Sequence, residues 1–270
     1  MLDRKKNPDM RARWIVVLAG LALIALTARA FGHSPDNRSE SYVSIYSNDW
    51  RAGIGDLKLQ EARRSDIAWV ADPVVPSRRA IGVRLHRNED FTRLVNGLPR
   101  AEFLLPSSVV LVSGHEYLIR WRTYLPSDFV FDRQQMEIIM QIHQSGLTGA
   151  PPFMLTLYGE EYAFSVRGGV DTAHGFGGRF CCATTDRGKW VEWTLQYAPD
   201  ASGRQAVTHL WRDGVSVFEG SGRPNAYPGD EDAYLKFGVY KPEWLKSPSD
   251  VDFISLYFGD VSVDVKKENR

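Results

Sequence analysis

Gln141 and His143 are the first residues of this chain whose types and spacing could do chemistry. At the two-residue period of a pleated strand, they share one face of the segment 136–143 with Glu137 and Ile139. The other face would carry only apolar side chains, which are Met136, Ile138, Met140 and Ile142. An amide and an imidazole on the open face of a strand can hold an anionic group and transfer a proton.

A second segment about a hundred residues later has the same design. Tyr234, Lys236 and Tyr240 would share one face of the segment 234–240, while Leu235, Phe237 and Val239 pack into a core. Gly238 removes a side chain between Lys236 and Tyr240 and would leave room for a ligand near the backbone. An ammonium four residues from a phenol would lower the phenol pKa from its unperturbed value of about 10.

A third segment, 100–103, places Arg100 and Glu102 on one face and Ala101 and Phe103 on the other. We expect Glu102 mainly to orient Arg100. Each segment alone also fits ordinary sheet: a half-buried strand, a solvated Tyr-Lys-Tyr ladder, or a surface ion pair. It is their occurrence together, in this order, that favours a reactive site.

The order R-x-E, Q-I-H and Y-x-K-x-G-x-Y resembles the jelly-roll polysaccharide lyases, a group that includes alginate lyases, glucuronan lyases and the heparin lyase I type. The similarity extends from about Ala80 to the C-terminus. It includes the run 117–126 (YLIRWRTYLP), Pro151-Pro152, Gly188-Lys189-Trp190 with Trp193, and Trp211-Arg212-Asp213-Gly214. The resemblance implies β-elimination on a uronic-acid polymer, in which the proton at C5 is removed and the glycosidic oxygen at C4 is expelled.

The same resemblance implies roles for the residues. Gln141, His143 and Arg100 would hold the uronate carboxylate and stabilise the enolate-like charge, an electrostatic task of the oxyanion type. Tyr240 would be the general acid, and also the base where both groups leave from one face; His143 is the rival base. Lys236 completes the expected catalytic set. The residues expected to bind substrate are Glu102, Arg84, His86, Tyr234 and Lys241.

The elements that must position these residues read as strands. From about Asp66 onward, short alternating segments are separated by turn signals such as Asn96-Gly97 and Asp213-Gly214. Segments 207–211 and 215–218 predict a hairpin, and 253–265 predicts a closing strand or pair of strands. We expect an all-β fold, a concanavalin-like β-jelly-roll sandwich, as a single domain over residues 66–270.

The first thirty residues differ in kind. A basic stretch, an apolar run from Trp14 to Leu26 and Ala28-Arg29-Ala30 predict a signal peptide over 1–30, with a membrane anchor as the alternative, followed by a leader over 31–65. We therefore expect a secreted or periplasmic protein that meets a membrane only if this segment is not cleaved. Without it, 27 Lys/Arg and 31 Asp/Glu leave a net charge of −4, which argues against nucleic acid as a partner.

The remaining expectations concern ligands. The two cysteines, Cys181 and Cys182, are adjacent, so a vicinal disulfide and two free thiols are both open, and no metal site is expected around them. No cofactor is required, although Asp230, Glu231 and Asp232 could bind a structural calcium ion. Segment 170–178 is either a lid over the site or an ordinary surface loop. We expect a monomer.

Two other functions remain open on the same fold. A carbohydrate-binding sandwich would keep the cleft without the reaction, but it needs no general acid beside a carboxylate clamp. A retaining glycoside hydrolase needs two carboxylates about 5 Å apart. The strand 136–143 offers Glu137 alone. The expected partner is an acidic polysaccharide.

Overall fold

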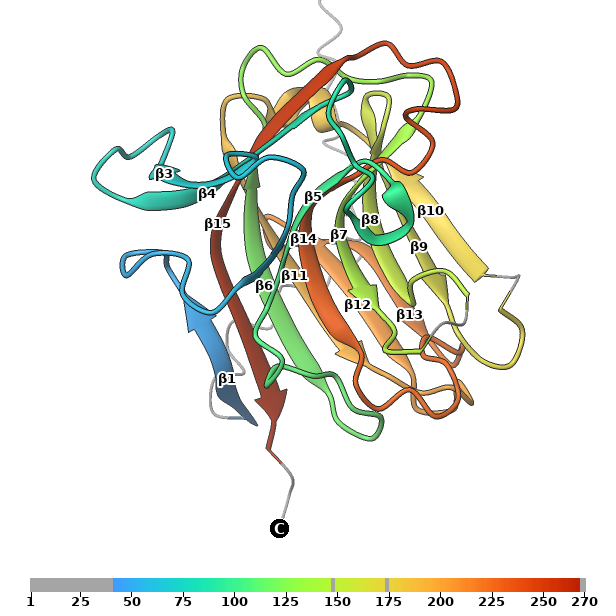
Figure 1. The fold of residues 1–270 in the computed structure, drawn as a ribbon. Helices are drawn as coiled ribbons and strands as arrows, with labels where there is room; N and C mark the ends of the chain where they lie inside the picture. Colours follow the sequence, from blue (N-terminus) through green and yellow to red (C-terminus); the bar gives the residue numbers. More distant parts are fainter. Residues whose placement is uncertain (1–40, 147–148, 173–174, 268–270) are drawn as a thin grey trace, which may run out of the picture. The chain divides into compact units, whose positions relative to one another are not determined.

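Two antiparallel β-sheets lie face to face in the computed structural model, which describes residues 41–146, 149–172 and 175–267 (Figure 1). Along its main path, one sheet runs β13 (Val215–Ser221), β12 (Val207–Arg212), β11 (Trp190–Ala198), β6 (Tyr117–Tyr124), β15 (Phe253–Lys266), β4 (Arg79–His86) and β3 (Ile67–Ala71), and β1 (Tyr42–Asn48) also pairs with β15. The other runs β10 (Gly175–Phe180), β9 (Glu161–Arg167), β8 (Phe153–Tyr158), β7 (Met136–His143), β14 (Tyr234–Tyr240), β5 (Arg100–Leu104) and β2 (Lys58–Gln60). The all-β sandwich predicted from the sequence is confirmed.

Helical structure in the described ranges is limited to short 3₁₀ turns, which include η2 (Val95–Gly97) and η3 (Ala183–Asp186). No helix in these ranges is long and apolar enough to cross a membrane. The signal peptide or anchor predicted over 1–30 lies outside the described residues.

Aromatic side chains from both sheets fill the space between the layers. Phe237 of β14 stacks on Phe103 of β5, with ring centroids 5.5 Å apart, and Phe103 meets the edge of Phe258 of the opposite sheet at 5.4 Å. Trp121 lies against both Trp193 and Phe237. Burial of each such ring contributes about 1.5–3 kcal/mol relative to exposure. The core therefore fixes the inner face of β14, and the residues that alternate with it are directed to the outer face.

The sandwich starts earlier than the boundary predicted at Asp66. Tyr42 pairs with Lys266 through β1 and β15, and Gln60 pairs with Glu102 through β2 and β5. The richness of residues 31 to about 50 in Ser, Asn and Asp is typical of a leader, but β1 of this stretch is part of the sheet. The hairpin around Asp213-Gly214 and the closing strand are confirmed as β12–β13 and β15.

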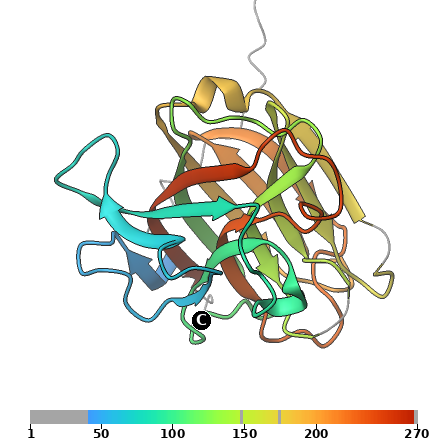
Figure 2. The same cartoon turned by 45° about the horizontal axis from the view of Figure 1, so that its top comes forward.

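The segment predicted as a lid or loop is in part a strand. Residues from Gly175 onward form β10 and pair with β9, while 173–174 lie outside the described residues. In Figure 2, where the top of the molecule comes forward, the β3–β4 hairpin projects beyond the sandwich. Cys181 and Cys182, which follow β10, are joined as a vicinal disulfide.

Candidate active site

The three motifs meet because β5, β14 and β7 are neighbours in one sheet (Figure 1). Across these strands, Tyr240 pairs with Arg100, Lys236 pairs with Gln141, and Tyr234 pairs with His143. Residues directly opposite each other in antiparallel strands project to the same side. The apolar partners Phe237, Val239 and Ile142 belong to the core, so the polar set faces outward.

Glu102 lies at the centre of this polar set. Its Oε2 accepts from Lys236 Nζ at 2.7 Å and from Arg100 Nη1 at 3.3 Å, and its Oε1 accepts from the Gln141 amide. All four side chains are buried, with at most 4% of any residue exposed. Two cations share one carboxylate, so the cluster keeps an excess positive charge at the outer face. Glu102 orients these groups, because each of its two oxygens accepts from at least one of them.

Arg100 links the cluster to Tyr240. Its guanidinium lies over the Tyr240 ring, 4.0 Å from the centroid, and Nη2 donates to the carbonyl oxygen of Val95 at 3.2 Å. Burial raises the pKa of Tyr240, and Arg100 opposes that shift without reversing it. The sequence-based expectation of a lowered pKa is wrong, because the effect of burial is larger than the opposing effect of the nearby cation. Tyr240 therefore keeps its proton near neutral pH and suits the role of a general acid.

His143 is arranged for the opposite task. Its Nδ1 lies 2.7 Å from the carbonyl oxygen of Gln144, and a carbonyl can only accept, so Nδ1 carries the hydrogen. The neutral ring then presents a lone pair on Nε2. Burial lowers the pKa of His143, and Lys236 and Arg100 act in the same direction against the bond to Gln144. The ring stacks on Tyr234 with centroids 5.3 Å apart, which fixes its plane.

A β-bulge changes the predicted faces of β7. The register shifts between Ile138 and Met140, so Ile139 and Met140 both enter the core and Ile138 lies opposite Tyr240 on the outer face. Glu137 is turned inward as a result, although simple alternation placed it beside Gln141. An inward carboxylate cannot serve a glycoside hydrolase site on this face.

Gly238 also has a different role from the predicted one. Its φ is +137°, and a Cβ there would lie 2.2 Å from the carbonyl oxygen of Ala101. Glycine is needed because β5 approaches the bulged part of β14 closely, rather than to make space for a ligand.

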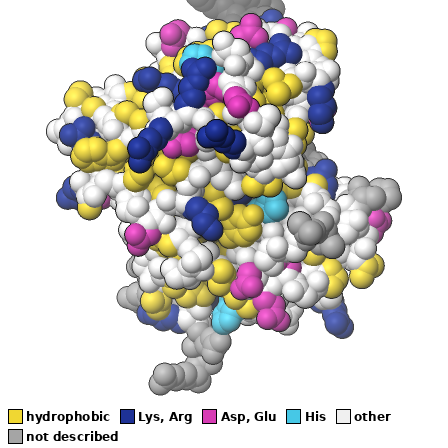
Figure 3. All heavy atoms as spheres, in the orientation of Figure 1, with side chains coloured by type: hydrophobic (Ala, Val, Ile, Leu, Met, Phe, Trp, Pro, Cys, Tyr) yellow, Lys and Arg dark blue, Asp and Glu magenta, His cyan; other side chains and the backbone are white. Residues whose placement is uncertain are grey.

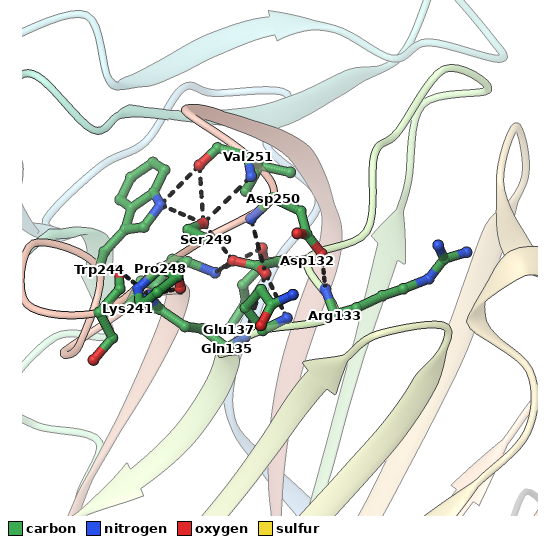
Figure 4. A network of polar contacts seen from close by, with 12 residues as sticks. Asp132, Arg133, Gln135, Glu137, Lys241, Trp244, Pro248, Ser249, Asp250 and Val251 are labelled. Carbon is green, nitrogen blue, oxygen red and sulfur yellow. Dashed lines mark hydrogen bonds and ion pairs between the residues drawn. The ribbon is translucent and has the colours of Figure 1, made fainter.

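Lys241 does not reach the outer face. It is fully buried, and its Nζ forms ion pairs with Asp132 at 2.7 Å and Glu137 at 3.2 Å (Figure 4). Asp132 also accepts from Ser249, and the backbone N–H of Asp250 donates to it. The prediction that Lys241 binds substrate is therefore not retained. Lys241 directly follows Tyr240 in the sequence, and adjacent residues of an extended chain point to opposite sides.

Comparison with known proteins gives the family. The family model described as polysaccharide lyase matches residues 46–262. The chain belongs to the polysaccharide lyase family. The resemblance and the enzymatic class predicted from the three motifs are thereby confirmed.

Solved structures support the fold of this lyase. The endo-β-1,4-glucuronan lyase of the fungus Trichoderma reesei matches with a TM-score of 0.65 and 16% identity, covering 82% of this chain and 95% of that chain. Alginate lyase A1-II′, a member of polysaccharide lyase family 7, matches with a TM-score of 0.53 and 16% identity over 78% and 95%. Botulinum neurotoxin type C matches with a TM-score of 0.53 and 10% identity over 87% and 50%. A search of curated proteins finds no match. The jelly-roll architecture predicted for the lyase is confirmed.

Arg84 and His86 are not part of this site in the lyase. Both lie on β4 of the other sheet, where Ile81, Val83 and Leu85 face the core. Arg84 is therefore on the outer side of the far layer, and the His86 ring packs on Phe253 at 4.5 Å. Sheet membership depends on pairing with β15, which no local pattern in the sequence reports.

The three residues of the acidic run 230–232 lie in different environments in the lyase. Asp230 accepts from the backbone N–H and hydroxyl of Ser145, while Glu231 and Asp232 are exposed. The described residues contain no group of three or more His, Cys, Asp or Glu arranged to hold a metal ion. Asp230 instead ties the end of β7 to the segment that leads into β14.

Figure 3 shows one face of the lyase in the orientation of Figure 1. Lys and Arg side chains gather above a hydrophobic patch near the centre of this face. The sequence motifs include residues of β5, β7 and β14 on this face but not the outward residues of β9, such as Ser165 and Arg167. Alternation in 161–167 could have found them, because the apolar residues Tyr162, Phe164 and Val166 alternate with a second set that is polar except for Ala163.

Proposed function

We propose that this lyase cleaves a uronic-acid polysaccharide by β-elimination at the cluster around Glu102. The observation that carries the proposal is the charge of that cluster. Arg100 and Lys236 share one buried carboxylate at an outer face, so a second anion is needed to balance them. A uronate carboxylate has the charge and the two-oxygen geometry to accept from Arg100, Lys236 and Gln141.

Neutralising that carboxylate is the electrostatic part of the reaction. The C5 proton is weakly acidic while the carboxylate keeps its charge, because removal of the proton adds a second negative charge to the same group. Donors that are already oriented by Glu102 would stabilise the enolate-like intermediate without reorganising. Lys236, Arg100 and Gln141 have that preorganisation in their contacts with Glu102.

The neutral ring of His143 and the protonated phenol of Tyr240 suit them to the roles of base and acid. His143, neutral with a lone pair on Nε2, takes the C5 proton; the C5–H electrons form the C4=C5 double bond, and the C4–O bond breaks. The leaving oxygen takes the proton of Tyr240, which stays protonated because of its raised pKa. Return of the proton from His143 to Tyr240 through solvent restores the enzyme. His143 and Tyr240 lie on either side of the Lys236–Gln141 pair along β14, which supports separate acid and base groups.

The glucuronan and alginate lyases that share this fold suggest which polymers to test. Full-length enzyme would be incubated with glucuronan, polymannuronate, polyguluronate and heparan sulfate while the ultraviolet absorbance of the new C4=C5 bond is recorded. We expect a rise with at least one polymer and its loss in Tyr240→Phe. No rise with any polyuronate, while binding is still detected, would contradict the proposal in favour of carbohydrate binding alone.

A further inference from the structure

Arg167, the last residue of β9, lies in the same row of the sheet as His143. Its N–H donates to the carbonyl oxygen of Pro152 at 2.8 Å, directly before β8. The next residue of β8, Phe153, pairs with Ile142 and with Val166. A row across the sheet therefore passes from His143 over Pro152 to Arg167. With neighbouring strands about 4.8 Å apart, the backbones of these two residues are about 10 Å apart.

The Arg167 side chain faces the same side as the proposed catalytic groups. Phe164 and Val166 belong to the core, so Ser165 and Arg167 alternate to the outer face of β9, where Arg167 is half-buried. Gly175 pairs with Arg167 on β10, and a Cβ at Gly175 would lie 2.5 Å from Arg167 Cγ. The missing side chain at Gly175 leaves space for the arginine stem.

Arg167 differs from the other arginine on this part of the sheet. Arg179 lies 4.2 Å above the Tyr158 ring and is 3.8 Å from the Glu161 carboxylate. Arg167 Nη1 donates to the hydroxyl of Ser165 at 2.9 Å, but within the described part of the chain no carboxylate lies within ion-pair distance of it. A half-buried guanidinium that lacks a counter-anion is partly desolvated and gains most from binding one.

We infer that Arg167 binds the carboxylate of a neighbouring sugar unit while His143 and the Glu102 cluster engage the unit that reacts. This inference rests on the proposed function. A chain lying along the row from His143 to Arg167 meets a second cation about two strands beyond the catalytic base. The enzyme would therefore bind polymers that carry a carboxylate on that unit more tightly than polymers in which that unit is a neutral sugar.

The test is binding in a background where the reaction is blocked. In full-length Tyr240→Phe protein, the Kd for a short homo-oligouronate would be measured by calorimetry with Arg167 present and with Arg167→Gln. We expect Kd to rise about tenfold, the usual size of a lost charge-assisted bond. Arg167→Lys should recover part of the loss, and Arg179→Gln, the matched change at the arginine that already has a carboxylate partner, should alter Kd less than about twofold.

A second measurement separates a binding role from a structural one. In the enzyme with Tyr240 intact, Arg167→Gln should raise KM for the homopolymer and leave kcat within about twofold, since Arg167 lies outside the reacting unit. When part of the polymer's carboxyl groups have been reduced, Arg167→Gln should raise KM less than it does with the intact homopolymer. If Arg167→Gln and Arg179→Gln change Kd equally, the inference is wrong. If the oligouronate binds through Arg167 but no double bond forms with Tyr240 intact, the inference stands and the proposed function fails.

Discussion

Lys236 of β14 and Lys241, the residue directly after β14, are both buried and both ion-paired, yet they lie on opposite faces of the sheet. Lys236 projects outward, where it shares Glu102 with Arg100. Lys241, five residues later, projects inward between Asp132 and Glu137. The outer cluster holds two cations for one carboxylate, and the inner one holds a single cation for two carboxylates.

The difference in charge indicates a difference in task. An outer cluster with surplus positive charge is incomplete until an anion binds, which suits a substrate carboxylate. The inner network is closed by its own hydrogen bonds to Ser249 and Asp250 and holds the segment that follows Tyr240 against β7. Removal of one partner from a buried network of this kind strongly destabilises the fold, because a buried charge is left without its counter-charge. Chemistry and stability are thus divided between the two faces of one strand.

The largest expected effect is on the outer face. Tyr240→Phe should lower kcat by about 10³-fold, within the usual range for loss of a general acid, and leave KM nearly unchanged. The measurement is the ultraviolet rate on the preferred polyuronate. Tyr124→Phe is the matched control, because Tyr124 lies on β6 of the other sheet, and it should keep its activity. Retention of activity in Tyr240→Phe would move the acid to another residue.

A large effect on stability is expected on the inner face. Lys241→Met would leave Asp132 and Glu137 buried without a cation, so the free energy of unfolding should fall by about 3–5 kcal/mol. Urea unfolding followed by tryptophan fluorescence measures it. Lys246, which is exposed and 3.9 Å from Glu243, provides the control, and Lys246→Met should cost less than about 1 kcal/mol. Equal losses in the two variants would show that the inner network does not stabilise the fold.

A smaller effect is the pH dependence of stability. Burial raises the pKa of Glu137 from 4.5 to about 7, against the opposing effect of Lys241. The folded protein then binds more protons than the unfolded chain between these two pH values. Stability should therefore fall as the pH rises from about 4.5 to about 7, by about 1–3 kcal/mol, and become flat above that range. Glu137→Gln should remove this slope in urea titrations at several pH values; an unchanged slope would assign it to other groups.

The smallest effect concerns the acid limb of the activity profile. His143 must be neutral to act as the base, and its pKa lies below the ordinary 6.5 because of burial and the nearby cations. The value of kcat/KM should therefore keep its plateau down through pH 6.5 and decline only at lower pH. A limb centred above 6.5 would mean that another group limits the reaction.

The residues of the site were more predictable from the sequence than the residues of the inner ion-pair network behind it. Gln141, His143, Lys236 and Tyr240 were found because alternation is local and their neighbours on each strand are apolar. Their meeting with Arg100 and Glu102 depends on strand order, which the family resemblance supplied. Alternation failed for Glu137, because a bulge inserts one residue and reverses the faces beyond it.

Other errors have equally specific causes. Lys241 was included for its charge, although its spacing from Tyr240 placed it on the inner face. Arg84 and His86 satisfy alternation, but they belong to the far sheet because β4 pairs with β15 and β3. The direction of the Tyr240 pKa shift could not be found from spacing, because it depends on how deeply the phenol is buried.

The division between the two faces is tested most directly by Lys236→Met and Lys241→Met, with kcat and the free energy of unfolding measured on the same samples. In Lys236→Met, we predict a fall in kcat of about a hundredfold or more, since a donor to the developing charge is lost. Its loss of stability should be smaller than that of Lys241→Met, because Glu102 keeps Arg100 and Gln141. Lys241→Met, assayed where it is fully folded, should retain kcat within several-fold. Retained activity in Lys236→Met together with lost activity in folded Lys241→Met would contradict the account.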